Sequence, residues 1–221
     1  MIKEMIDNLL WAKWWVLTSF YQKQDFAYIL GITKIDKVTT SNPIDLFNVY
    51  SCVKATKYLD GDIAEVGVYK GGSAKVITLS EKRRHIHLFD TFEGLPEVSK
   101  HDTKQLGGTF CKGDFKSSFE VVNEYLKQHN VTLYKGLFPK TAEPIKYKKF
   151  SFVYLDVDIY SSTKDALEFF LPRMVKGGII LSHDYPNSHG VKKAFDEFYK
   201  GTKLELMDKQ VVIIKWSIKD T

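Results

Sequence analysis

Short apolar runs alternate with segments of helical periodicity from residue 62 to the end of the chain. The apolar runs predict seven strands, at 62–68, 85–90, 131–136, 150–158, 178–185, 204–209 and 211–216. Apolar residues spaced three or four apart predict helices between most of these strands, at 73–82, 117–128, 162–174 and 191–199. This alternation is typical of an α/β fold with a doubly wound, mainly parallel, seven-stranded Rossmann-like sheet and helices on both faces.

The two ends of the chain add to this plan. The last two predicted strands are separated by almost no sequence, whereas a parallel crossover needs a dozen or more residues, so we expect a C-terminal antiparallel hairpin at one edge. Residues 1–60 contain no convincing strand and predict an N-terminal helical cap. We expect this cap and the sheet-bearing domain, residues 61–221, to form one structural unit.

The first 23 residues have an apolar, tryptophan-rich body. Helical spacing relates Ile6, Leu9, Leu10, Trp14, Leu17 and Phe20, which predicts an amphipathic helix. Lys13 interrupts the stretch, no small-residue cleavage site is present, and the stretch is too short to span a bilayer; we therefore expect neither a signal peptide nor a membrane span. The helix is expected to pack on its own domain or to form a homodimer with a second copy, rather than to lie on a membrane.

Composition narrows the functional classes. With 44% hydrophobic and 14% aromatic residues, the 221-residue chain can build a substantial core. The net charge of +5 comes from lysines spread along the sequence, which indicates a solvated surface rather than a nucleic-acid interface. Cys52 and Cys111 are far apart, so neither a disulfide framework nor a thiolate zinc site is indicated, and a reducing cytoplasm is expected.

The first predicted strand leads into the segment EVGVYKGGSA, residues 65–74. Gly67, Gly71 and Gly72 permit a tight turn and close approach of a ligand to the backbone, and Ser73 can cap the next helix. Glu65 precedes a G-x-x-x-G-G loop instead of the dinucleotide pattern G-x-G-x-x-G. A carboxylate here suits an ammonium or sulfonium group better than a pyrophosphate, which it would repel.

Acids also follow the later strands. Asp90 ends the second strand in LFDTFEGLP, where an acid can accept hydrogen bonds from ribose hydroxyls or, alternatively, cap a turn. Asp114, in KGDF, can face an adenine edge or serve as an ordinary turn residue. Because ligands bind at the carboxyl ends of the strands in an open α/β sheet, we expect both near one site.

The fourth and fifth strands end in LDVDIY and SHDY. Asp156 and Asp158 are two apart on a predicted strand and so share a face, and two acids this close call for a cation or a proton between them. His183 and Asp184 follow the neighbouring strand. Together these residues predict a site for a hard divalent ion, although a single histidine such as His183 is more often structural.

Seven motifs resemble, in order, those of one known family over residues 43–200. They are EVGVYKGGSA, LFDTFEGLP, GDF, GLFPKT, LDVDIYSST, KGGIILSHDY and GVKKAFDEF. The chain is similar to the macrocin-type O-methyltransferases, S-adenosylmethionine enzymes that methylate sugar hydroxyls. The resemblance implies a class I methyltransferase fold and a saccharide or other small-molecule acceptor.

The resemblance also implies roles for individual positions. Glu65, Gly67, Gly71, Gly72 and Ser73 would hold the methionine part of the cofactor, Asp90 its ribose, and Asp114 would lie near the adenine. Asp156 and the residues at 183 and 184 would bind magnesium, and Asp158 would be the base. The chain departs from the family pattern at His183, where an acid is usual. Imidazole weakens a magnesium site and favours manganese, iron or zinc.

The sequence therefore predicts an S-adenosylmethionine-dependent O-methyltransferase assisted by magnesium or manganese. Two alternatives stay open: a metal-independent enzyme with His183 as general base, and a cofactor-binding protein without catalysis. A nicotinamide oxidoreductase lacks its glycine spacing, and a hydrolase lacks a G-x-S-x-G elbow. Acceptor specificity is expected in residues 1–60 and in the loop 93–112, whose composition suits a mobile lid.

Overall fold

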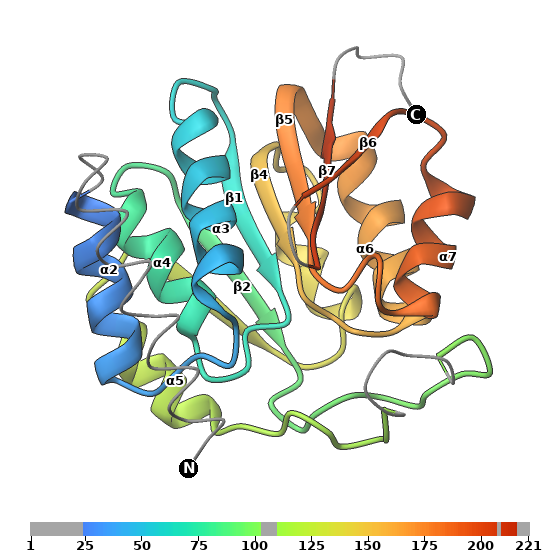
Figure 1. Ribbon diagram of the computed structural model, residues 1–221, viewed down its shortest axis with the longest axis horizontal. Coiled ribbons are helices and arrows are strands. Elements are labelled where there is room, and N and C mark those ends of the chain that lie inside the picture. The colour runs from blue at the N-terminus through green and yellow to red at the C-terminus, as the bar shows by residue number, and fades with distance from the viewer. Residues whose placement is uncertain (1–23, 103–109, 207–208, 216–221) are drawn as a thin grey trace.

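One seven-stranded sheet organises the protein, for which a computed structural model describes residues 24–102, 110–206 and 209–215 (Figure 1). Its strands are β1 (Asp62–Val66), β2 (Ile86–Asp90), β3 (Val131–Lys135), β4 (Phe150–Leu155), β5 (Met174–Ser182), β6 (Lys203–Glu205) and β7 (Val211–Ile214). The order is β3-β2-β1-β4-β5-β7-β6, with β1 to β5 parallel and β7 antiparallel to both of its neighbours. The predicted α/β sheet and its C-terminal hairpin are confirmed.

The helices form a layer on each face of the sheet. They are α2 (Gln24–Ile35), α3 (Pro43–Ala55), α4 (Gly72–Ser80), α5 (Phe119–Leu126), α6 (Tyr160–Phe170) and α7 (His189–Phe198), with short 3-10 turns η1 (Lys140–Ile145) and η2 (Leu171–Arg173). Figure 1 shows α2 to α5 on the left and α6 and α7 on the right. No strand occurs between Gln24 and Asp62, in agreement with the helical character predicted there.

Two hydrophobic clusters, one on each face, hold the layers to the sheet. Phe26 and Leu46 bring α2 and α3 into the first cluster, where they join strand residues such as Tyr154. Phe170 and Phe195 bring α6 and α7 into the second. All five of these side chains are at most 1% exposed, so α2 and α3 share the core of the sheet.

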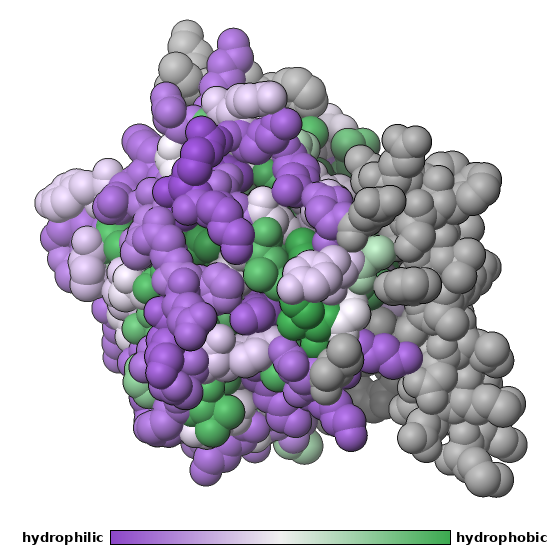
Figure 2. Space-filling view, turned by 90° about the vertical axis from the view of Figure 1, so that its left-hand side faces the viewer, coloured by the Kyte–Doolittle hydropathy of each residue, from purple (hydrophilic) through white to green (hydrophobic). Residues whose placement is uncertain are grey.

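The outer surface follows from the same amphipathic pattern. Figure 2 shows the side of the molecule on which α2, α4 and α5 lie, and hydrophilic side chains cover most of its described surface. Hydrophobic side chains gather there only in small groups. Nowhere in the described ranges is a helix both long and apolar enough to cross a membrane. The predicted amphipathic helix before residue 24 lies outside the described residues.

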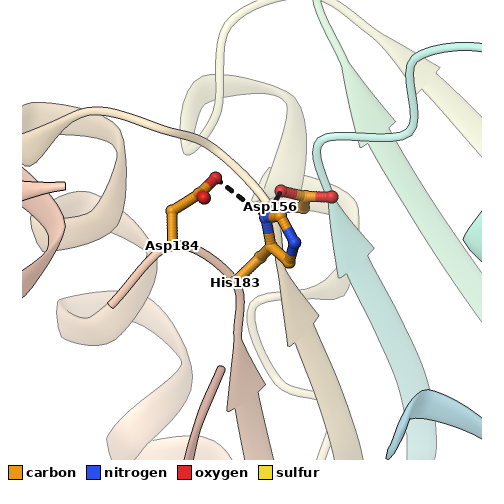
Figure 3. A group of neighbouring side chains, drawn as sticks. All are labelled: Asp156, His183 and Asp184. Atoms are coloured by element: carbon orange, nitrogen blue, oxygen red, sulfur yellow. Dashed lines mark hydrogen bonds and ion pairs between the residues drawn. The ribbon is translucent and has the colours of Figure 1, made fainter. Parts of the chain in front are cut away.

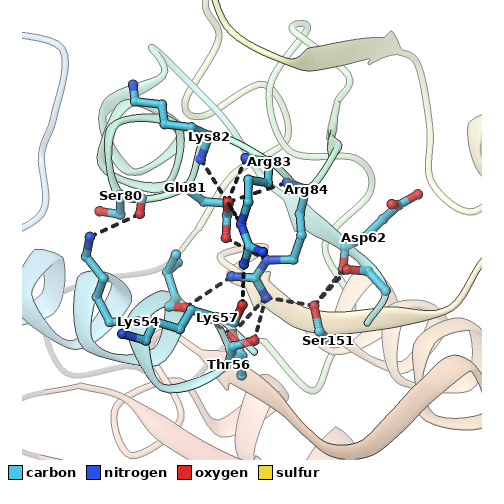
Figure 4. A network of polar contacts seen from close by, with 12 residues as sticks. Lys54, Thr56, Lys57, Asp62, Ser80, Glu81, Lys82, Arg83, Arg84 and Ser151 are labelled. Carbon is cyan, nitrogen blue, oxygen red and sulfur yellow. Dashed lines mark hydrogen bonds and ion pairs between the residues drawn. The ribbon is translucent and has the colours of Figure 1, made fainter. Parts of the chain in front are cut away.

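A buried ion pair fastens the amino-terminal edge of the sheet (Figure 4). Arg84 precedes β2, and its Nε lies 2.8 Å from a carboxylate oxygen of Glu81, with the two side chains 8% and 6% exposed. The guanidinium also donates to Ser151 Oγ of β4 at 2.8 Å and to the carbonyl of Thr56, just after α3, at 2.9 Å. This network lies at the amino ends of the parallel strands, away from their carboxyl ends. We therefore regard its role as structural.

Three local predictions differ from the structure. β4 ends at Leu155 and β5 at Ser182, so the acids predicted at strand tips occupy the loops that follow. Ser73 does not cap α4; the N-cap is Gly71, with φ 87°, and Ser73 lies inside the first turn. A left-handed backbone at the N-cap favours glycine over serine. The Ser73 hydroxyl is therefore not used for capping and can bond to another partner.

Candidate functional site

A cavity of about 520 Å³ opens at the carboxyl ends of the parallel strands. Loops after β1, β2, β3, β4 and β5 line it, together with residues 38–42 of the α2–α3 connection and with Lys209. This volume is in the range of small-molecule sites, and the place is the one expected where strand order reverses. Eight of the predicted site residues line it: Gly67, Gly72, Ser73, Asp90, Asp156, Asp158, His183 and Asp184.

Hydrogen bonds align the strand ends beneath the cavity. The N–H of Gly67 donates to the carbonyl of Phe89, the N–H of Asp156 to that of Val66, and the N–H of His183 to that of Leu155, each at 2.9 Å. The ladder therefore continues one residue beyond β1, β4 and β5. This continuation brings residues that are distant in sequence to one level of the sheet.

The loop between β1 and α4 depends on glycine at two positions. Gly67 has φ 89°, and a Cβ there would lie 1.8 Å from the carbonyl oxygen of Asp156. A Cβ on Gly72 would lie 2.5 Å from the Cβ of Thr39, which comes from the α2–α3 connection. The loop thus packs tightly between β4 and the residues before α3, and neither position has room for a side chain.

Glu65 lies beneath this loop and not in the cavity lining. It is fully buried, and one of its oxygens accepts a hydrogen bond from Ser73. Its other oxygen has no hydrogen-bond partner among the described residues. Burial raises the pKa of Glu65 well above its usual range; the Ser73 hydrogen bond opposes this rise, and the charges of Asp156 and Asp90 add to it.

Asp90 lines the cavity and at the same time ties two loops together. One carboxylate oxygen accepts hydrogen bonds from the N–H groups of Val68 and Tyr69, at 2.8 and 2.7 Å. The other accepts from the N–H of Phe92 at 2.7 Å. Since a carboxylate has about four lone-pair sites, these bonds leave capacity for a ligand hydroxyl.

Asp114 is outside the cavity lining. Its carboxylate accepts a hydrogen bond from the N–H of Cys111 at 2.7 Å, and its carbonyl accepts from the N–H of Leu95 at 2.8 Å. The structure therefore gives it a turn-forming contact, which was one of the two readings of KGDF. Its predicted place near an adenine stays a prediction.

Asp156, His183 and Asp184 form a compact cluster at one side of the cavity (Figure 3). Nδ1 of His183 lies 3.2 Å from Oδ1 of Asp156 and 2.8 Å from Oδ2 of Asp184. One ligand atom from each residue can be chosen so that all lie within 4.8 Å of one another. Burial alone would lower the pKa of His183, but the surrounding carboxylates raise it well above its usual range.

A further acid, Asp45 of α3, reaches the same histidine from the other side. Its Oδ2 lies 3.3 Å from Nε2 of His183, and its side chain is 2% exposed. No sequence argument singled out Asp45. The motif NPID predicts a helix start there, with Asn42 as N-cap and Asp45 three residues later, but it carries no information about a histidine 138 positions away.

Asp158 completes the acidic side of the cavity. It has φ 63°, a left-handed conformation that aspartate tolerates better than most residues. Removal from water raises the pKa of Asp158 well above its usual range, and the nearby carboxylates of Asp156 and Asp184, the second of which shares a hydrogen bond with it, add to the shift. Although burial opposes the change, the hydrogen bond with His183 lowers the pKa of Asp184.

The loop after β2 supplies aromatic residues to the lining, and its first part is held firmly. Phe110 and Phe115 face the cavity. Asp102 is fully buried; it accepts hydrogen bonds from the N–H of Tyr160 at 2.7 Å and from the hydroxyl of Ser99 at 2.6 Å. Asp102 therefore pins residues 99–102 to the start of α6, and the mobile lid predicted for 93–112 stays a prediction.

Residues 45–216 match the family model described as Macrocin-O-methyltransferase (TylF). This range covers most of the chain and contains every predicted site residue, although residues 38–42 of the cavity lining precede it. The same segment of the chain therefore carries the match, the strands of the sheet and the acids of the candidate site.

Two curated relatives and one solved structure are also similar. One is the 8-demethyl-8-(2,3-dimethoxy-alpha-L-rhamnosyl)-tetracenomycin-C 4'-O-methyltransferase of Streptomyces olivaceus, which is 28% identical over 155 residues. The aligned part is 63% of this chain and 59% of that protein. The Demethyldecarbamoylnovobiocin O-methyltransferase of Streptomyces niveus is 25% identical over 183 residues, 76% of this chain and 69% of that protein. The structure of the O-methyltransferase NovP has the same fold, with a TM-score of 0.68 and 22% identity over 81% of this chain and 83% of that one.

Proposed function

The chain belongs to the macrocin-O-methyltransferase family, and we propose that it transfers a methyl group from S-adenosylmethionine to a hydroxyl group of a saccharide or glycosylated small molecule. The observation that carries the proposal is one cavity that joins a glycine-rich loop at β1 to a cluster of acids after β4 and β5. Names of the relatives support the acceptor class, since one of them includes a rhamnosyl group.

The cofactor half of the cavity has groups that suit a cationic nucleoside. S-adenosylmethionine, when bound, supplies a methyl group on a positively charged sulfur. Glu65 lies below the loop with one unpartnered buried oxygen, an arrangement that favours an ammonium or sulfonium nearby. Asp90 has acceptor capacity for ribose hydroxyls while it holds the loop in place. Gly67 and Gly72 both line the cavity, and their close packing leaves no room for a side chain at either position.

The acidic half fits a divalent cation. Two ligand atoms about 2.1 Å from an ion and at right angles to each other are about 3.0 Å apart, which agrees with the 2.8 and 3.2 Å separations around His183 Nδ1. A set of two carboxylates and one imidazole suits manganese, iron or zinc better than magnesium. Such an ion would supply a Lewis acid that lowers the pKa of an acceptor hydroxyl.

Asp158 is the proposed general base. It lines the cavity beside Asp156 and Asp184, and its raised pKa makes it a stronger proton acceptor than an ordinary aspartate. His183 is less suited to this role, because its two ring nitrogens are directed at carboxylates: Nε2 at Asp45, and Nδ1 at Asp156 and Asp184. Neither nitrogen is left to take a proton from an acceptor.

Calorimetric titration with S-adenosylhomocysteine, followed by manganese and magnesium titrations of that complex, tests the proposal. We expect micromolar cofactor binding and a metal site that Asp156→Ala abolishes. Saccharide acceptors would then be screened for methylation. Cofactor binding and turnover without metal binding would favour the metal-independent alternative, in which His183 would have to leave its carboxylate contacts to act as base. No cofactor binding would exclude methyl transfer, and cofactor binding without turnover on any acceptor would favour a binding protein.

A further inference from the structure

The carboxylate of Asp45 and those of Asp156 and Asp184 lie against opposite nitrogens of the His183 ring. Nε2 is 3.3 Å from Asp45, whereas Nδ1 is 3.2 Å from Asp156 and 2.8 Å from Asp184. The His183 side chain is only 13% exposed, so these contacts are made largely out of water. The ring is therefore held from both sides, with Nδ1 directed into the candidate metal site.

Asp45 is itself rigidly placed. It occupies the N3 position of a capping box. In this box the Asn42 side chain accepts a hydrogen bond from the N–H of Asp45 at 3.0 Å, and Oδ2 of Asp45 accepts one from the N–H of Asn42 at 3.4 Å. Gln210, just before β7, donates from its side chain to the carbonyl of Asp45 at 3.4 Å and accepts from Asn48 at 2.8 Å. Asp45 is thus held through its carboxylate by the capping bond and through its backbone carbonyl by Gln210.

The chemistry of the pair determines which nitrogen keeps a hydrogen. An ionised carboxylate can only accept, so the contact to Asp45 requires a hydrogen on Nε2. The contacts of Nδ1 to Asp156 and Asp184 call for a hydrogen on that nitrogen as well. A cation bound by the two carboxylates would take the place of this hydrogen, so that Nδ1 would offer its lone pair while Nε2 keeps its hydrogen. Histidine ligands of metals generally donate their other N–H to a carboxylate, carbonyl or water in this way, and removing that partner weakens binding about 10–100-fold.

We propose that Asp45 is a positioning residue that holds His183 through Nε2–H, so that Nδ1 is presented to a divalent cation together with Asp156 and Asp184. This inference rests on the metal site of the proposed function and deepens it, because it gives α3 a direct part in that site. Through Asp45, α3 would take part in the surroundings of the ion as well as cover the sheet.

Manganese titration of the Asp45→Ala protein tests the role. We expect its affinity for Mn²⁺ to fall about 10–100-fold, with affinity for S-adenosylhomocysteine unchanged. Asp45→Asn should recover part of the loss, because the amide oxygen can still accept the hydrogen bond and the capping contact without the charge. Asp25→Ala is the matched control: Asp25 also accepts a hydrogen bond from α3, through Tyr50, but it is absent from the cavity lining.

A second readout separates orientation from general loss of structure. In the Zn²⁺-bound protein, NMR should find the Nε2–H proton of His183 shifted downfield by its hydrogen bond to Asp45, and Asp45→Ala should remove this shift; loss of the signal in His183→Gln identifies it. Unchanged Mn²⁺ affinity in a folded Asp45→Ala protein would overturn the proposal, as would a wild-type protein that binds neither ion. Failure to bind S-adenosylhomocysteine would instead count against the proposed function, since the metal titrations need no cofactor.

Discussion

The carbonyl oxygen of Asp156 lies 1.8 Å from the position that a Cβ on Gly67 would occupy. That oxygen belongs to the backbone of the loop after β4, so it cannot move aside as the end of a flexible side chain would. The loop after β1 and the loop after β4 are therefore in contact at a point where only glycine fits.

We expect Gly67→Ala to destabilise the protein by at least about 3 kcal/mol, because it adds a backbone collision to the strain of a positive φ. Gly113→Ala is the control. Gly113 has φ 87° but no described heavy atom within 4 Å of its Cβ position, so the strain alone should cost about 1–2 kcal/mol. Chemical denaturation of both variants checks the difference, and equal losses would contradict the contact.

Asp158→Asn should reduce turnover by about 10²–10⁴-fold, the usual contribution of a general base. Asparagine tolerates the left-handed backbone at this position, so the fold should be retained. Initial rates with an acceptor that the wild-type protein methylates, measured beside the S-adenosylhomocysteine affinity, check the prediction. Full turnover in this variant would remove Asp158 from the mechanism.

Arg84→Ala should lower the free energy of unfolding by about 3–5 kcal/mol, because it leaves the buried carboxylate of Glu81 without its ion pair. Arg83→Ala is a matched control: the Arg83 side chain is 73% exposed and 3.9 Å from the same carboxylate, so we expect a change within about 0.5 kcal/mol. Urea denaturation compares the two. Cofactor affinity should be unaffected in both, since the network lies at the other edge of the sheet; a cofactor-binding defect in folded Arg84→Ala would contradict this separation.

His87 should make stability depend on pH. The side chain is 3% exposed, and its ring nitrogens lie 3.1 Å from Asp62 and 3.0 Å from the Tyr134 hydroxyl. Burial lowers the pKa of His87; Asp62 opposes the shift and His85 adds to it. The contribution of neutral His87 to the free energy of unfolding is thus fully present above a pH of about 6.5. It is lost as the pH falls below that value, by at most about 1.4 kcal/mol per pH unit.

The check is to measure the free energy of unfolding of the wild-type and His87→Gln proteins between pH 8 and pH 5, at intervals of about half a pH unit. Glutamine cannot take up a proton in this range, so the difference between the two proteins should shrink as the pH falls. A constant difference would mean that His87 does not titrate with unfolding.

Most of the fold and half of the site follow from local sequence patterns. The parallel sheet brings Asp156, His183 and Asp184 together because β4 and β5 are neighbours in register, and alternating strands and helices are enough to predict that. Asp45 could not be predicted, because its contact with His183 depends on how α3 packs over the sheet. The N-cap role predicted for Ser73 is wrong, because Gly71 adopts a positive φ and starts the helix two residues earlier.

The hydrogen bond between Gln210 and Asp45 spans 165 residues, whereas the bonds that Asp90 accepts from the loop after β1 span 21 and 22. During synthesis on a ribosome, the loop around Gly67 can therefore close as soon as β2 has emerged, but the support beneath His183 must wait for β7. The half of the candidate site around Asp90 would form early in translation and the half around His183 last. Nascent chains halted at increasing lengths would become resistant to proteolysis in that order.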